Sequence, residues 1–493
     1  MRSGPLPGES PRDLTGHAVS GAKWTGSSAA VNGALAFLQT AVAAYFLSPA
    51  DFGLMSMAMV VVGFANLFAD IGLSSAIVYR RQPSEQELAS LYWTNVAFGA
   101  VVFAILQLGV PLFVELFREP RLADPLRLAA TVFLVVPFGQ QHQFLLQKRL
   151  EFGILAKTTS AGYLAGAIVT IVLASRGFGV YALVIGHLAN VVLRTVVLVA
   201  TQWNRWRPHF HFAVNDLSSY LSFGLYQTGD RAANYFNVYL AHALIGSLLG
   251  ARVLGYYSLA FELVGKPLEA ITPVMTRVAF PIISLIREDR LRVKRGYLRM
   301  LQMLSAANFP LALGIAAIAP LAVATFYGNE WQPTVILVEL LAVVALLRST
   351  GSPVGALLLG SGKANWGFYW SASKMLLQLP GIYIGIRWGG AIGAAVAYLI
   401  LQVLFSAAAY ALLVRRLLPI RLTEYLACLV PSLILAAGMA LAVRLTGLAA
   451  IDVPNAYRLV LEIAVGVATY AGLLLVFRRA LLFDMLRLVG RRG

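Results

Sequence analysis

The sequence is poor in cysteine and in charge. Cys428 is the only cysteine among 493 residues, so neither a disulfide framework nor a cysteine-based metal site is expected. Charged residues make up only 12% of the chain, about half the share usual in soluble domains, while hydrophobic residues make up 59%. Such a composition cannot cover a water-soluble surface with polar side chains. It predicts a membrane protein.

Acidic residues are scarce as well. The chain has 22 Asp and Glu against 39 Lys and Arg, a formal net charge of +17. Such a surplus suits a nucleic-acid binder, but basic residues also gather in the cytoplasmic loops of membrane proteins. With a cytoplasmic N-terminus, the loops and tails predicted inside hold 25 basic residues and those predicted outside hold 8. This bias predicts that both termini are cytoplasmic, with no nucleic acid as partner. The first twenty residues have no apolar core of a signal peptide, so no cleaved signal is expected.

Long apolar stretches are abundant. A membrane-crossing helix needs about 20 mainly apolar residues, and fourteen stretches qualify. The predicted spans are 24–47, 52–79, 91–117, 126–147, 155–175, 180–201, 220–249, 253–286, 298–327, 334–360, 365–386, 391–414, 425–445 and 457–477. The predicted fold class is therefore an all-α, multi-pass integral membrane protein with about 14 transmembrane helices.

An internal repeat organises these spans. Residues 48–58 align with 250–260, which places Gly53 over Gly255, and two further segments align at offsets of 209 and 211. Chance similarity between apolar segments is the alternative. The repeat predicts a cytoplasmic, disordered tail (1–23), an N-lobe of six spans (24–215), a C-lobe of six spans (216–418), and a C-terminal helix pair with a cytoplasmic tail (419–493). Parallel repeats of this kind are a recurrent transporter design, with the substrate path between the halves.

Polar residues share one face of the seventh predicted span. At 100° per residue, Gln227, Asp230, Arg231, Asn234 and Asn237 fall on one arc of a helix. Charges at membrane depth are costly, so they mark a substrate path by default. A buried Asp230–Arg231 pair that only joins helices is the alternative. The arc is a candidate lining of a substrate cavity.

The eighth predicted span carries a second charged stripe. Glu262, Lys266, Glu269 and Arg277 share one helical face, and Glu262 lies at about the depth of Arg231. These four residues are therefore candidate cavity-lining groups. An internal bridge between Glu262 and Lys266, without a ligand role, is the alternative.

Two further polar positions are candidates. Arg348 lies within the tenth predicted span and is the repeat counterpart of a polar run at 140–143. Matching polarity in both halves suggests a lined lumen, although snorkelling toward the surface also explains it. Asp70 lies inside the second span and is a candidate ion-coupling site, with packing or capping around Gly72 as the alternative.

Two segments resemble a known family. Phe52-Gly53 after a Ser-Pro loop, and Asp70-Ile-Gly-Leu-Ser-Ser-Ala-Ile-Val at the end of the second span, resemble the opening of bacterial polysaccharide exporters of the Wzx type. These exporters belong to the multidrug, oligosaccharidyl-lipid and polysaccharide (MOP) flippase superfamily, and the colanic-acid exporters look most similar. The resemblance extends over nearly the whole chain.

The resemblance implies a flippase that acts in lipopolysaccharide biosynthesis and polysaccharide export. It would move undecaprenyl-diphosphate-linked oligosaccharide from the cytoplasmic to the outer leaflet of the bacterial inner membrane by alternating access. The implied partners are the lipid-linked oligosaccharide, the bilayer, and a polysaccharide polymerase or other export machinery. In this role Arg231 and Lys266 would bind phosphate oxygens, and the nearby carboxylates would hold them when substrate is absent.

Other functions fit less well. A multidrug or cation exporter of the same superfamily is the main alternative, and a membrane glycosyltransferase or polymerase is a weaker one. Gly360-Ser-Gly-Lys363 lacks the first glycine of a phosphate-binding loop, because position 357 is Leu. The six histidines show no metal-ligand spacing. We therefore expect no enzyme activity, no catalytic residues, no cofactor and no metal.

Overall fold

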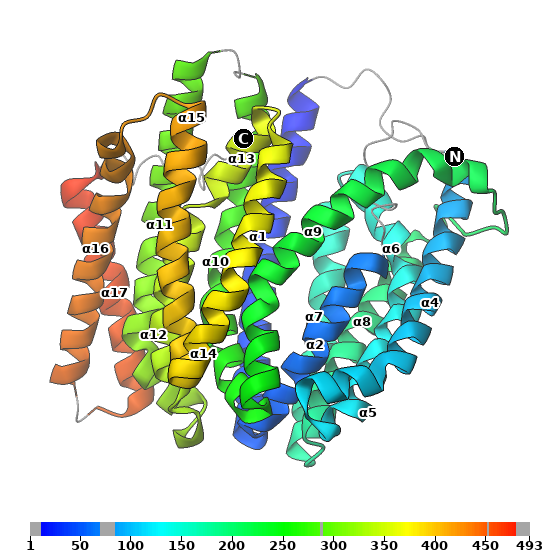
Figure 1. Cartoon of the computed structure of the whole chain (residues 1–493), viewed down its shortest axis with the longest axis horizontal. Helices are drawn as coiled ribbons and strands as arrows, with labels where there is room; N and C mark the ends of the chain where they lie inside the picture. Colours follow the sequence, from blue (N-terminus) through cyan, green and yellow to red (C-terminus); the bar gives the residue numbers. More distant parts are fainter. Residues whose placement is uncertain (1–10, 70–83, 286–288, 451–452, 480–493) are drawn as a thin grey trace. The chain divides into compact units, whose positions relative to one another are not determined.

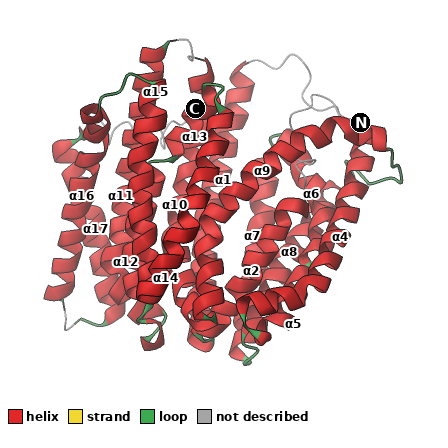
Figure 2. Ribbon diagram, in the orientation of Figure 1, coloured by secondary structure: helices red, strands yellow, loops and turns green. Residues whose placement is uncertain are grey.

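A computed structural model describes the backbone of residues 11–69, 84–285, 289–450 and 453–479 (Figure 1). Side chains at 11–23, 25, 27, 69, 214–231, 269–285 and 364 lie outside this description. Every regular element in the described ranges is a helix, as Figure 2 shows. This confirms the predicted all-α class.

The helices follow the chain in sequence order, and most of them are long. The α-helices are α1 (Pro11–Phe46), α2 (Pro49–Ala69), α4 (Glu85–Phe117), α5 (Ala123–Ala130), α6 (Val132–Lys148), α7 (Phe152–Ser175), α8 (Val180–Gln202), α9 (Val214–Leu249), α10 (Ala251–Leu285), α11 (Arg290–Phe326), α12 (Thr334–Ser349), α13 (Ser352–Gly360), α14 (Ala364–Ala409), α15 (Arg415–Leu417), α16 (Leu422–Ala449) and α17 (Asn455–Phe477). Short 3-10 helices lie at Pro120–Leu122 and Asn329–Trp331, and a π-helical turn lies at Tyr410–Val414.

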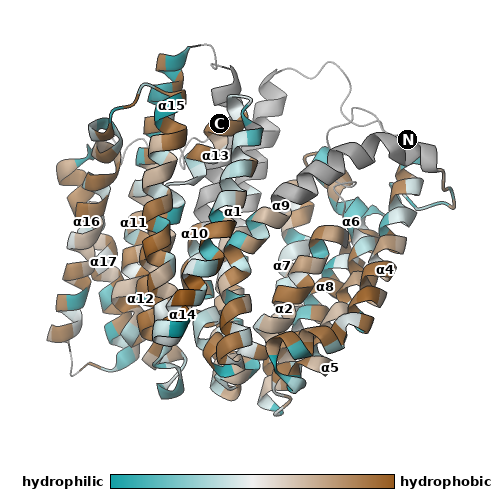
Figure 3. Ribbon diagram, viewed as in Figure 1, coloured by the Kyte–Doolittle hydropathy of each residue, from teal (hydrophilic) through white to brown (hydrophobic). Residues whose placement is uncertain are grey.

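Eleven helical segments among the described residues are long and apolar enough to cross a bilayer. Hydrophobic residues dominate their length (Figure 3). On α4, the large side chains of Ile105, Leu108 and Leu112 are exposed, as expected for a surface that faces lipid. An integral membrane protein is therefore confirmed, whereas the exact number of fourteen spans stays a prediction.

One of these segments, 365–417, is long enough for two crossings. The helix axis breaks at Gly389 and Gly390, where the backbone leaves helical geometry and Gly390 adopts a φ of 58°. Glycine alone tolerates the conformation of Gly390 without strain. The break falls between the predicted spans 365–386 and 391–414, so this segment agrees with two predicted helices.

The chain divides into two compact units, residues 1–255 and 256–493. In the first unit, α7 pairs with α8, α1 packs on α7, and α9 lies against α2 and α4. The Tyr235 hydroxyl of α9 donates a hydrogen bond to the Val60 carbonyl oxygen of α2, at 2.8 Å. The helix whose backbone carries Asp230 and Arg231 is thus packed inside the first unit.

The repeat-equivalent glycines contact each other's segments within this unit. A Cβ atom on Gly53 would lie 1.7 Å from the carbonyl oxygen of Ala251, and one on Gly255 would lie 1.8 Å from the carbonyl oxygen of Pro49. The contact is reciprocal, because each repeat presents the same glycine to the start of the other repeat. Two copies related by a two-fold axis make contacts of this kind. An internal repeat would produce a contact of this kind, and the repeat itself stays a prediction.

The last two helices, α16 and α17, belong to the second unit, and α16 packs along α11. Polar contacts fix α16 near both of its ends. The Lys294 ammonium of α11 lies 2.8 Å from both carboxylate oxygens of Glu424 near the start of α16. Near the other end, Arg444 of α16 pairs with Glu339 of α12. The helix pair is therefore an integral part of this unit.

Helix α4 begins with a capping box. The Ser84 hydroxyl accepts a hydrogen bond from the Glu87 backbone N–H at 3.1 Å, and the Glu87 carboxylate accepts one from the Ser84 N–H at 2.9 Å. We expect Ser84→Ala to lower the free energy of unfolding by about 1 kcal/mol, because the Glu87 backbone N–H loses the side-chain oxygen that accepts its hydrogen bond. Thermal unfolding in detergent measures the effect. Ser84→Thr should retain most of the stability, and equal losses in both variants would contradict the capping role.

Candidate functional site

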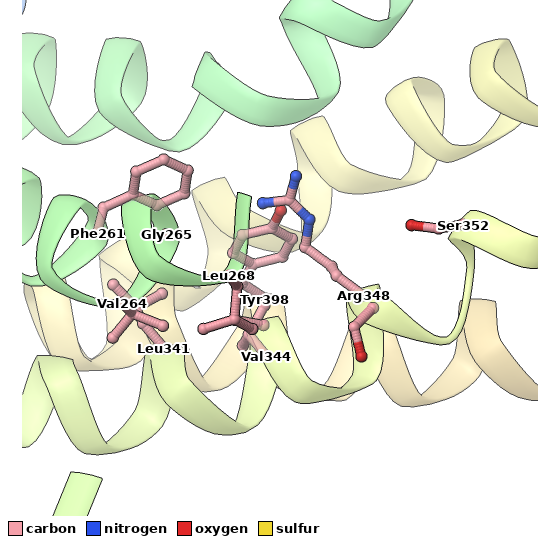
Figure 4. A pocket seen from close by; sticks show the side chains of 11 residues that line it. Phe261, Val264, Gly265, Leu268, Leu341, Val344, Arg348, Ser352 and Tyr398 are labelled. Atoms are coloured by element: carbon pink, nitrogen blue, oxygen red, sulfur yellow. The ribbon is translucent and has the colours of Figure 1, made fainter. Parts of the chain in front are cut away.

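A cavity of about 450 Å³ lies within the second unit. Four helices form it, so its lining joins segments that are far apart in sequence (Figure 4). The lining residues are Phe261, Val264, Gly265 and Leu268 from α10, Leu341, Val344, Ala345, Arg348 and Ser349 from α12, Ser352 from α13, and Tyr398 from α14.

The cavity is apolar apart from one guanidinium and a few hydroxyl groups. Val264, Leu268, Leu341 and Val344 are buried aliphatic residues of its wall. Arg348 is the one charged residue among the lining residues, and its side chain extends from α12 toward the same side as the Tyr398 hydroxyl (Figure 4). A cavity of this kind can receive an amphiphile that carries an anionic group.

The break between α12 and α13 places Arg348 at this position. Helix α12 ends at Ser349 and α13 starts at Ser352, with Pro353 in the first turn of α13. Proline favours the first turn of a helix because its missing N–H is not needed there. Arg348 therefore projects from the last turn of α12.

Arg348 forms no ion pair with a carboxylate whose side chain the structure describes. A charged side chain at membrane depth is stable only beside a partner or in a watery cavity. Since Arg348 lines a cavity, its guanidinium N–H groups are available to an anion in that space. A guanidinium also presents forked donors that match phosphate oxygens.

Glu262 and Lys266 lie on α10 beside the cavity but do not line it. The Lys266 ammonium is 2.6 Å from a Glu262 carboxylate oxygen, which is the internal bridge that the sequence admits as an alternative. About half of each side chain is exposed, 50% for Glu262 and 46% for Lys266. Exposure keeps both groups accessible, and their role in substrate binding stays a prediction.

Most of the polar arc on the seventh predicted span lies outside the residues whose side chains the structure describes. Gln227, Asp230 and Arg231 have backbone positions in α9, but their side chains lie outside the described residues, and those of Glu269 and Arg277 in α10 do as well. Asp70 lies outside the described residues altogether. Asn234 is described and is exposed, whereas Asn237 is buried.

The polar run at 140–143 does not form a lumen lining at two of its positions. Gln141 and His142 are fully buried, and the Gln141 amide donates a hydrogen bond to the Leu88 carbonyl oxygen of α4 at 2.8 Å. The Gln143 side chain accepts a hydrogen bond from Arg194 of α8, at 2.7 Å. In the first unit these groups join helices, whereas Arg348 in the second unit faces a cavity.

Sequence reasoning missed Tyr398, a buried aromatic residue that lines the cavity together with Arg348. It lies in an apolar part of α14, and its hydroxyl is the only local hint, because a buried tyrosine usually places its hydroxyl near a polar partner. No spacing rule links residues 348 and 398. Only the packing of α14 against α12 brings them to one cavity.

Comparisons with known proteins agree with this architecture. Residues 42–336 match the family described as "Polysaccharide biosynthesis protein". The lipopolysaccharide biosynthesis protein WzxC of Escherichia coli (strain K12) is 31% identical over 408 residues, which are 83% of this chain and 83% of that protein.

Solved structures share the fold. The lipid II flippase MurJ, in an inward closed conformation, has a TM-score of 0.75 at 16% identity, over 94% of this chain and 100% of that chain. An inward-facing multidrug resistance MATE transporter of the MOP superfamily has a TM-score of 0.57 at 16% identity, over 80% of this chain and 94% of that chain. The family match covers more than half of the chain, and WzxC is more than 30% identical over most of it, so the chain belongs to the polysaccharide biosynthesis protein family.

Proposed function

We propose that the protein is a flippase for undecaprenyl-diphosphate-linked oligosaccharide, which it moves from the cytoplasmic to the outer leaflet of the bacterial inner membrane. Family membership and the fold shared with a lipid II flippase support this function. The observation that carries it is Arg348, a cation on the wall of an apolar cavity without a described carboxylate partner.

The physical problem of such a flippase is a diphosphate in a low-dielectric slab. Moving an unpaired anion into an apolar medium costs several kcal/mol or more, so the path must supply compensating donors. Arg348 supplies forked N–H donors, and Ser349, Ser352 and Tyr398 add hydroxyl groups to the same cavity. The aliphatic wall beside them suits the lipid part of the substrate. The cavity thus offers polar donors for a phosphate beside an apolar wall for a lipid chain.

The repeat supports alternating access as the transport mechanism. We take residues 24–215 and 216–418 as the two lobes, 419–493 as the last helix pair with its tail, and both termini as cytoplasmic. Asp230, Arg231, Gln227 and Asn234 would line the path together with the second stripe, Glu262, Lys266, Glu269 and Arg277. In this scheme carboxylates such as Glu262 hold the cations between transport cycles, and Asp70 is a candidate coupling site. A polysaccharide polymerase would take over the flipped product.

The first test is Arg348→Gln in a host from which the native gene is deleted. We expect cell-surface polysaccharide to fall at least about tenfold, because a hydrogen bond to a charged group contributes about 1.5–3 kcal/mol. Lipid-linked oligosaccharide should accumulate at the same time. Arg348→Lys should restore only part of the export, since it keeps the charge but loses the fork.

Arg387→Gln is the matched control. It removes the same charge from an exposed position in α14 that does not line the cavity, and export should remain near that of the wild type. Equal export by the Arg348 and Arg387 variants, both expressed at wild-type level, would refute the role of Arg348. If the gene deletion leaves polysaccharide unchanged and instead sensitises cells to cationic dyes, the protein is a multidrug exporter.

A further inference from the structure

The segment that joins α8 to α9 has an unusual composition. This segment, Trp203–Ala213, is called the strap here, and it begins directly after the candidate membrane span Val180–Gln202. It contains Arg205, Arg207, two tryptophans, two phenylalanines and two histidines, and no acidic residue. Its position after a spanning helix places it at the level of the bilayer surface.

The strap is firmly attached to the first unit. Trp206 is buried against Leu88, Leu91, Tyr92 and Leu145. A guanidinium nitrogen of Arg205 lies 2.6 and 2.7 Å from the two carboxylate oxygens of Glu151. These contacts fix the first half of the strap on α4, α6 and the start of α7.

The second half is tied to α4. The Trp93 indole N–H donates a hydrogen bond to the His209 carbonyl oxygen at 3.0 Å, and the Phe210 ring stacks on Trp93 with centroids 4.6 Å apart. The backbone N–H of Ala213 donates to the Ser90 hydroxyl at 3.1 Å. These contacts hold the second half of the strap against α4.

Despite these attachments, the strap exposes large aromatic side chains. Phe210 is 90% exposed, Phe212 is 61% exposed and Trp203 is 46% exposed. The Arg207 guanidinium lies 5.3 Å from the Trp203 ring centre, and its Nε donates to the Trp203 carbonyl oxygen at 2.9 Å. Arg207 is thereby held beside exposed aromatic rings, and no described carboxylate neutralises it.

We propose that the strap is a binding surface for anionic phospholipid headgroups at the bilayer surface. Aromatic rings favour the headgroup region, where one side of a ring is apolar and the other is hydrated. Cationic side chains next to such rings are attracted to anionic lipids and gain about 1 kcal/mol each, or about fivefold in binding. The absence of acidic residues in the strap removes the repulsion that would oppose this contact.

This binding surface has a structural consequence. The strap is the direct connection between α8 and α9, and α9 leads to the second unit. A lipid bound at Arg207 and the exposed rings would hold the start of α9 at the bilayer surface. The inference does not depend on the transported substrate, because its residues lie in a different unit from the Arg348 cavity.

A fluorescent label tests the proposal. The full chain carrying Cys428→Ser and Phe212→Cys is labelled at the new cysteine with an environment-sensitive dye and placed in phosphatidylcholine nanodiscs with increasing phosphatidylglycerol. We expect the dye emission to shift to shorter wavelength as phosphatidylglycerol increases, and high salt to reverse the shift. With Arg207→Gln added, the phosphatidylglycerol fraction at half of the shift should rise up to about fivefold.

Arg121→Gln is the matched control, because it removes one charge near the opposite end of α4 and should leave the titration unchanged. Native mass spectrometry of the unlabelled wild type and Arg207→Gln gives a second readout, in which the variant should retain fewer phosphatidylglycerol molecules. An emission shift that is the same in phosphatidylcholine alone would show apolar insertion without headgroup binding and would overturn the proposal. A dye that stays in a water-like environment in every lipid mixture would also overturn it and would leave a protein partner as the occupant.

Discussion

Gly53→Ala and Gly255→Ala are each expected to destabilise the protein strongly, with little folded protein recovered in detergent. The added methyl carbon would lie 1.7 Å from the Ala251 carbonyl oxygen in the first variant and 1.8 Å from the Pro49 carbonyl oxygen in the second. Backbone atoms cannot rotate away as a side chain can, so the start of α2 and the start of α10 would have to separate. Overpacking costs about 1–3 kcal/mol in ordinary cores, and this contact is tighter than those.

Thermal unfolding in detergent and the yield of monodisperse protein measure the effect. Gly33→Ala is the matched control, because it lies in helix α1 of the same unit and its added methyl group would contact nothing within 4 Å. That control should be neutral or slightly stabilising, since alanine favours a helix over glycine. If all three variants unfold at the same temperature, the close contacts of Gly53 with Ala251 and of Gly255 with Pro49 are absent from the folded protein.

Arg458→Gln is expected to lower stability by about 3 kcal/mol or more. Glu462 of α17 is only 3% exposed, and its carboxylate oxygen lies 3.3 Å from the Arg458 Nε, one turn earlier on the same helix. A Cβ atom on Gly447 of α16 would lie 2.5 Å from a Glu462 carboxylate oxygen, which shows how closely the two helices enclose this group. Removing one partner of a buried ion pair typically costs about 3–5 kcal/mol, because the other charge remains buried.

A double-mutant cycle isolates the pair. Glu462→Gln together with Arg458→Gln should recover much of the stability lost in Arg458→Gln, because no uncompensated charge is left between α16 and α17. Thermal unfolding of the wild type, both single variants and the double variant supplies the four values. Strictly additive losses would contradict the coupling. Arg478→Gln, which follows the end of α17, should change stability little.

The helix positions could be predicted because hydrophobicity is a local property. The spans predicted at 155–175 and 180–201 agree with α7 and α8 within a few residues at each end. The span predicted at 334–360 matches one candidate membrane span with the same bounds, and a break at 350–351 divides it into α12 and α13. A hydropathy pattern does not show this break, because both helices are apolar. Pro353 was the available signal, since proline in the first turn marks a helix start.

The candidate site was less predictable. The sequence indicates Arg348 as the repeat counterpart of the polar run at 140–143, and the structure places it on a cavity. Tyr398 was missed because its proximity to Arg348 depends on how α14 packs against α12. The sequence shows Gly53 and Gly255 only as aligned positions of a predicted repeat. That neither position has room for a larger side chain follows only from the structure, which places the Ala251 and Pro49 carbonyl groups against them.

The amino-acid sequence by itself determined the membrane environment, the all-α class and the family resemblance. These properties follow from composition and from patterns within short segments, and neither depends on how the chain folds. Only the tertiary structure decided which polar residues join helices and which face a cavity. Gln141 and Arg348 are both polar residues in apolar helices, yet one is bonded to a neighbouring backbone and the other lines an open space. The difference lies in the helices packed around them, because an intramembrane polar group is satisfied by whatever its neighbours offer.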